Sequence, residues 1–89
     1  MKLNRARKKL KKNGFEQKKQ VPSATSSIRG QEVWVDKEDT GTPISFFFQG
    51  DNIDGAFKVY GREQDQPQFD YWDSIFTRNL SEAIRFSRC

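Results

Sequence analysis

An 89-residue chain has room for one small domain. Its 16 Lys and Arg residues outnumber its 12 Asp and Glu residues, it contains no histidine, and its only cysteine is Cys89. This composition excludes an intramolecular disulfide and a cysteine–histidine zinc site, and it removes the commonest general base of enzymes. We therefore expect no enzyme activity, no cofactor and no bound metal.

The charge is distributed unevenly along the chain. Residues 1–20 carry nine basic side chains and one acidic side chain, a net charge of +8, whereas residues 21–89 carry seven basic and eleven acidic ones, a net charge of −4. Such asymmetry is typical of a basic tail that meets a polyanion. We divide the chain into a basic, disordered arm (1–20), a linker (21–30) rich in Ser and Thr, and a folded domain (31–89).

The arm has only a thin apolar stripe. Leu3, Ala6 and Leu10 fall at helical spacing, and Asn13-Gly14 would end a helix there. The surrounding Lys and Arg side chains repel one another at i,i+4, and a short isolated helix of this kind is unstable in water. The sequence therefore predicts disorder for the free arm.

Three strands are predicted in the domain, over residues 32–37, 44–49 and 56–62, because apolar runs there are bounded by turn residues. Residues 69–73 could add a fourth strand. The short connections favour antiparallel pairing.

Alternation along these strands predicts which side chains face the core. Val33 and Val35 are expected to face it, which puts Trp34 and Asp36 on the opposite face. The other predicted core residues of the sheet are Ile44, Phe46, Phe48, Phe57 and Val59. The side chains predicted to point outward are Phe47, Lys58 and Tyr60.

A C-terminal helix is predicted after Asn79, which can serve as the N-cap, with Glu82 completing a pair that resembles a capping box. Its apolar face is formed by Leu80, Ala83 and Ile84. The expected fold class is therefore α+β, a small three- or four-stranded antiparallel sheet with one C-terminal helix, preceded by the disordered basic arm.

The basic arm is the strongest functional signal, because residues 5–12 hold six basic side chains in eight positions. Such a segment gains affinity for DNA or RNA by releasing counterions, without reading sequence. A solubilising tail or a localisation signal is the alternative explanation of the same pattern. We expect a non-enzymatic binding protein whose arm contacts nucleic-acid phosphates. The predicted contact residues are Lys2, Arg5, Arg7, Lys8, Lys9, Lys11, Lys12, Lys18 and Lys19.

A different class of function is also compatible with the sequence. In this second interpretation the domain is a small protein-binding module or inhibitor that uses an acidic and aromatic surface. The residues of that surface are Trp34, Asp36, Glu38, Asp39, Tyr60 and Trp72. Outward aromatics on a sheet can also stack on single-stranded bases, although packing beneath a helix or loop is the simpler expectation.

The chain has no segment that resembles a signal peptide, since no apolar stretch follows its first basic residues. Its longest apolar run is Phe46–Phe48, far too short to span a membrane. We expect a cytoplasmic protein.

Overall fold

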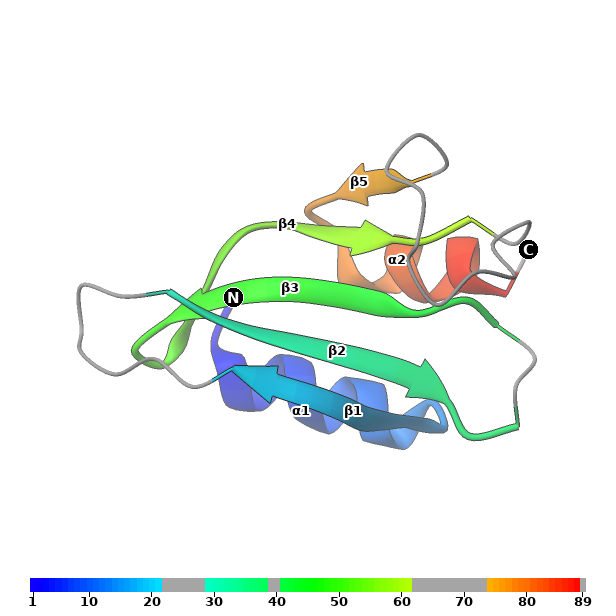
Figure 1. Cartoon of the computed structure of the whole chain (residues 1–89), viewed down its shortest axis with the longest axis horizontal. Coiled ribbons are helices and arrows are strands. Elements are labelled where there is room, and N and C mark those ends of the chain that lie inside the picture. Colours follow the sequence, from blue (N-terminus) through cyan, green and yellow to red (C-terminus); the bar gives the residue numbers. More distant parts are fainter. Residues whose placement is uncertain (22–28, 39–40, 62–73, 89) are drawn as a thin grey trace.

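The computed structural model describes residues 1–21, 29–38, 41–61 and 74–88. Five strands form one antiparallel sheet in the order β1-β2-β3-β4-β5, and two helices flank them in the chain (Figure 1). The elements are α1 (Leu3–Lys12), β1 (Phe15–Val21), β2 (Gly30–Asp36), β3 (Ile44–Gln49), β4 (Asn52–Val59), β5 (Ile75–Thr77) and α2 (Leu80–Ser87). The fold is mixed α+β, as the sequence predicts.

The two helices lie against the same face of the sheet (Figure 1). Helix α1 packs on β1, and α2 packs on β3, β4 and β5. Among the described residues, one hydrophobic core fills the space between the sheet and both helices. Its residues are Leu3, Ala6, Leu10, Phe15, Trp34, Ile44, Phe46, Phe48, Phe57, Val59, Leu80, Ala83 and Ile84.

The prediction of a disordered arm over residues 1–20 is wrong for this structure. These residues form α1 and most of β1. Leu3, Ala6 and Leu10 are buried in the common core, so the thin apolar stripe seen in the sequence packs against the sheet. An isolated helix of ten residues is unstable, but most helical stability in proteins comes from packing of this kind.

The sheet has five strands, not the three or four that the sequence predicts. The sequence of β1, FEQKKQV, is polar and therefore does not predict a strand. This composition suits an edge strand, where lysines discourage further pairing. At the other edge, β5 is only three residues long. The predicted strand at 69–73 and most of the predicted linker at 21–30 lie outside the described residues.

The predicted faces of β2 are reversed. Trp34 and Asp36 are buried beneath the helices, whereas Val33 and Val35 are half-buried on the opposite face. The indole N–H of Trp34 donates a hydrogen bond to the buried carboxylate of Glu32, at 2.9 Å. In β3 and β4 the predicted core residues are confirmed, because Ile44, Phe46, Phe48, Phe57 and Val59 are all buried.

Helix α2 begins where the sequence predicts. The side-chain oxygen of Asn79 accepts a hydrogen bond from the Glu82 N–H at 3.2 Å, as an N-cap should. The Glu82 carboxylate accepts from the Thr77 hydroxyl at 2.8 Å, and that hydroxyl oxygen accepts from the Asn79 N–H at 3.1 Å. The capping box is thus closed through Thr77. The predicted apolar face of Leu80, Ala83 and Ile84 is buried.

Candidate nucleic-acid interface

The beginning of helix α1 is joined to the hairpin between β3 and β4. The Leu3 N–H donates to the carbonyl of Asp51 at 2.8 Å, and the Ile53 N–H donates to the carbonyl of Met1 at 2.9 Å. The Lys2 ammonium also lies 3.4 Å from the Asp51 carboxylate, although both side chains are well exposed. The two backbone hydrogen bonds therefore hold this end of the helix, because exposed ion pairs contribute little.

The other end of α1 is joined to Lys37, which directly follows β2, and to Arg88, which caps the end of α2. Asn13 caps the helix, and Gly14 adopts a φ of 85°, a left-handed conformation that glycine reaches without strain. The Gly14 carbonyl accepts from the Lys37 N–H at 2.9 Å. Arg88 donates to the Asn13 carbonyl, and its guanidinium lies 5.1 Å from the centre of the Phe15 ring.

Side chains on the two flanks of α1 fix its rotation about its own axis. On one flank, Nε of Arg7 donates to the Glu32 carboxylate at 2.9 Å, and Nη2 contacts the same oxygen. On the other flank, the Lys9 ammonium donates to the Ser81 hydroxyl of α2. With the apolar stripe facing the sheet, these contacts set which side chains point away from the protein.

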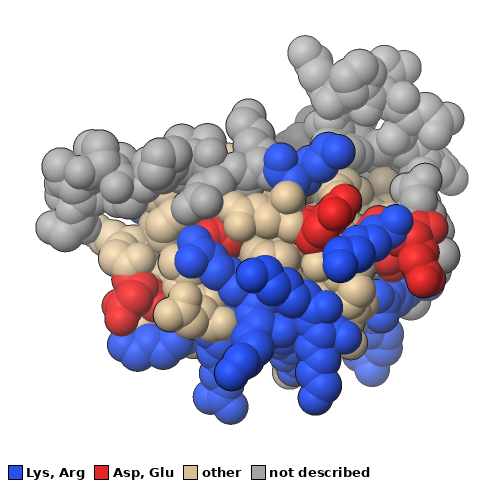
Figure 2. Space-filling model, turned by 90° about the horizontal axis from the view of Figure 1, so that it is seen from below, with Lys and Arg blue, Asp and Glu red and all other residues tan. Residues whose placement is uncertain are grey.

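The charged side chains on the outward side of α1 are all basic. Arg5, Lys8 and Lys12 are exposed on the side opposite the buried stripe, and α1 contains no acidic residue. Arg5, Lys8, Lys9, Lys12 and Asn13 line a shallow hollow there. In Figure 2 a large group of Lys and Arg side chains lies at the centre of this side of the molecule, with smaller basic groups and several acidic side chains around it.

This arrangement concentrates positive charge at some energetic cost. Arg5 and Lys9 are four residues apart on one helix face, as are Lys8 and Lys12, and like charges at that spacing destabilise a helix by roughly 0.2–0.5 kcal/mol per pair. Packing of α1 on the sheet offsets this cost. An anion bound across the face would relieve the repulsion, so the surface is suited to a partner with repeated negative charges.

The structure brings together most of the residues predicted to contact nucleic acid. Seven of the nine lie on or directly before α1: Lys2, Arg5, Arg7, Lys8, Lys9, Lys11 and Lys12. Arg7 differs from the rest, because it is half-buried in its ion pair with Glu32. Lys18 is exposed on the edge strand β1, and the side chain of Lys19 lies outside the described part of the chain.

Two residues of the predicted acidic and aromatic surface do not lie at the surface of the protein. Trp34 and Asp36 are buried beneath the helices, and Asp36 is bound there by Nε of Arg88 at 3.3 Å. Glu38 is exposed and Tyr60 is half-buried. The two remaining members, Asp39 and Trp72, are outside the described residues. Trp34 and Asp36 are therefore unable to meet a partner at the protein surface.

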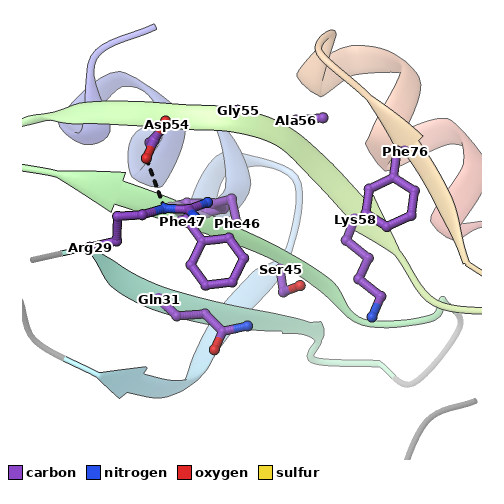
Figure 3. A pocket seen from close by; sticks show the side chains of 10 residues that line it. All are labelled: Arg29, Gln31, Ser45, Phe46, Phe47, Asp54, Gly55, Ala56, Lys58 and Phe76. Atoms are coloured by element: carbon purple, nitrogen blue, oxygen red, sulfur yellow. Dashed lines mark ion pairs between the residues drawn. The ribbon is translucent and has the colours of Figure 1, made fainter. Parts of the chain in front are cut away.

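The sequence patterns do not predict a hollow that lies on the face of the sheet opposite the helices, here called the outer face. It has a volume of about 240 Å³ and lies where β4 bulges away from β3 (Figure 3). Ser45 pairs with Lys58 and Phe47 pairs with Asp54, which leaves three residues of β4 opposite one of β3. Gly55, at φ 87°, lies in this bulge. A glycine inside a strand pattern is the one sequence signal that could have indicated it.

Comparison with known proteins identifies no relative: no family model, no curated protein and no solved structure matches the chain. Within the described ranges, no group of three His, Cys, Asp or Glu side chains is placed to hold a metal ion. No helix among those same residues is long and apolar enough to cross a membrane. Arguments about function therefore depend on the geometry of the surfaces described above.

Proposed function

We propose that this protein binds nucleic acid without catalysing a reaction, and that helix α1 makes the contacts to phosphate groups. The observation that carries the proposal is the cluster of Arg5, Lys8, Lys9 and Lys12 on one side of a helix that is held at both ends. A cationic surface whose backbone is already ordered loses less conformational entropy on binding than a flexible tail does.

The spacing of these side chains suits a phosphate backbone. Residues four apart on a helix are separated by about 6 Å along its axis, which is close to the roughly 6.8 Å that separates every second phosphate of one DNA strand along the duplex. Three or four contacts of this kind would make the affinity fall roughly 40- to 150-fold between about 50 and 200 mM salt. Either DNA or RNA meets this description, and the cytoplasm is the proposed location.

The test is a set of binding titrations in which charge is removed from α1 or from elsewhere. The variant Arg5→Gln/Lys8→Gln/Lys12→Gln removes three exposed cations from α1. The control Lys37→Gln/Arg78→Gln/Arg85→Gln removes three exposed cations outside it. Fluorescence anisotropy with labelled duplex DNA, single-stranded DNA and single-stranded RNA measures the affinity of each protein across a salt series.

The α1 variant is expected to lose most of its affinity for all three ligands, and the control is expected to lose much less. Equal losses in the two variants would mean that only net charge matters, which contradicts a specific role for α1. Absence of binding by the unmodified protein at low salt would end the proposal.

A further inference from the structure

The hollow on the outer face contains a guanidinium that is already held in place. Arg29 Nε lies 2.8 Å from the Asp54 carboxylate, and the guanidinium lies 4.3 Å from the centre of the Phe47 ring. Figure 3 shows Arg29 extending along the sheet between these two partners. Its side chain nevertheless remains 53% exposed, so Arg29 and Phe47 present a planar, cationic and aromatic surface to solvent.

The rest of the hollow adds groups of complementary chemistry. Gln31 is paired with Phe47 across β2 and β3, and its side-chain amide lies beside the Phe47 ring (Figure 3). Across the hollow, Lys58 of β4 is paired with Phe76 of β5, whose side chain is 58% exposed. The site thus offers two aromatic rings, an amide that donates and accepts hydrogen bonds, and cations on both sides.

The chemistry of these groups indicates what would bind. Arg guanidinium planes and aromatic rings are surfaces on which unpaired bases stack, and an amide can hydrogen-bond to a base edge. Asp54 pairs with the charge of Arg29, so the guanidinium plane of Arg29 serves for stacking. A volume of about 240 Å³ is below the roughly 300–1,000 Å³ of typical small-molecule sites, so it suits one ring of a larger ligand.

We propose that this hollow binds a base of a single-stranded nucleic acid, stacked on Arg29 and Phe47, and that the ligand of this protein is therefore single-stranded. This inference rests on the proposed function, and it narrows the class of ligand from nucleic acid in general to single strands. Bases inside a duplex are stacked and paired, so they cannot enter the hollow without being extruded.

The two surfaces adjoin the same end of the sheet. Asp54 and Phe47 lie next to the β3–β4 hairpin, and the beginning of α1 is hydrogen-bonded to Asp51 and Ile53 of that hairpin. Lys2 lies beside it as well, in contact with Asp51. A flexible single strand with one base in the hollow could pass around this end and place its phosphates along α1.

The test compares single-stranded and duplex ligands for variants of the hollow. The probes are a labelled RNA of about 12 nucleotides that forms no secondary structure, and the matched RNA duplex. Phe47→Leu keeps an apolar side chain but removes the ring, and Phe47→Tyr keeps the ring. Arg29→Lys keeps the charge but removes the planar guanidinium. The unfolding midpoint of each variant establishes that it is folded.

Phe47→Leu and Arg29→Lys are each expected to weaken binding of the single strand roughly 5- to 30-fold, which is the lower part of the range for stacked bases. Phe47→Tyr is expected to bind normally, and affinity for the duplex should be unchanged in all three. Unaltered affinity for the single strand in the Leu and Lys variants would overturn the inference, as expected if the outer face instead docks a protein.

A second measurement separates this inference from the role of α1. Adenosine monophosphate, followed by NMR, is expected to shift the Arg29 Nε–H and the Gln31 side-chain amide in the unmodified protein and in the α1 variant alike. If the titrations show that α1 does not contribute to binding, adenosine monophosphate should still produce these shifts. If the shifts are absent and Phe47→Leu has no effect, the hollow is not a base site, whatever α1 does.

Discussion

The Arg7 guanidinium of α1 is bound to the Glu32 carboxylate in β2, 25 positions further along the chain. Glu32 is completely buried, and its second oxygen accepts the indole N–H of Trp34. A buried carboxylate is costly unless it is paired and hydrogen-bonded, and here both conditions are met. The pair therefore links the rotation of the basic helix to the sheet.

Replacing Glu32 by Gln is expected to lower the free energy of unfolding by about 1–3 kcal/mol. The amide can still accept hydrogen bonds, but it no longer supplies a countercharge to Arg7. The loss should be smaller than that for a fully buried pair, because 28% of the Arg7 side chain is exposed. Urea unfolding measures the change, and Glu38→Gln, at an exposed position nearby, should change stability by less than about 0.5 kcal/mol.

Asn79→Ala should destabilise the protein by about 1 kcal/mol, because the Glu82 N–H loses its side-chain acceptor. For a domain of this size that corresponds to a fall of roughly 4–8 °C in Tm, which thermal denaturation followed by circular dichroism can detect. Asn79→Asp keeps the acceptor oxygen and serves as the control. Equal losses in the two variants would show that the cap contributes nothing.

Gly30→Ala is expected to destabilise the protein by about 1–3 kcal/mol through crowding. A Cβ atom at Gly30 would lie within 3.0 Å of three carbons of the Phe48 ring, which belongs to the core. The φ of Gly30 is not positive, so the cause is space and not backbone strain. Adding Phe48→Leu should relieve the crowding, and the double variant should then be more stable than the sum of the single losses predicts. Strictly additive losses would contradict this explanation.

The α1 variant lacking Arg5, Lys8 and Lys12 should also change the salt dependence of duplex DNA binding. Each phosphate contact contributes about 0.9 to the slope of log affinity against log salt, so the slope should fall in magnitude by about 2.7. Titrations at several salt concentrations measure it. A lower affinity with the same slope would mean that these side chains support the fold and do not contact phosphates.

Local patterns in the sequence were sufficient for the parts of the fold that depend on neighbouring residues. Asn79 and Glu82 are three residues apart, and their capping interaction forms within one turn of helix. The alternation of Phe46, Phe47 and Phe48 likewise indicates the buried face of β3, because two bulky residues lie on one face and one on the other.

The face of β2 could not be predicted in this way. Val33 and Val35 are apolar and so is Trp34, so alternation alone gives two plausible core faces. The choice depends on Glu32 and Asp36, which are buried because Arg7 and Arg88 reach them from distant parts of the chain. The pattern of polar and apolar residues alone predicts that both carboxylates are exposed.

The sequence predicts which basic residues belong to the candidate interface, but it does not predict that they lie on an ordered helix. The basic residues near the N-terminus were identified correctly as a cluster, yet the helix that orders them depends on Phe15, Lys37 and Arg88 contacts that follow later in the chain. Arg29 falls within the predicted linker, since nothing local in the sequence indicates its ion pair with Asp54.

The contact of Arg88 with the Asn13 carbonyl joins residues 75 positions apart and has a consequence for biosynthesis. Helix α1 is translated first but has no surface to pack on until the strands follow, and short helices do not persist alone. Its cations thus become an ordered array only after the strands have been translated, and the contacts of Lys9 with Ser81 and of Arg88 with Asn13 are added once α2 has followed. A polyanion that prefers the ordered array binds the native chain more tightly than the nascent one, and by mass action it would stabilise the newly folded protein.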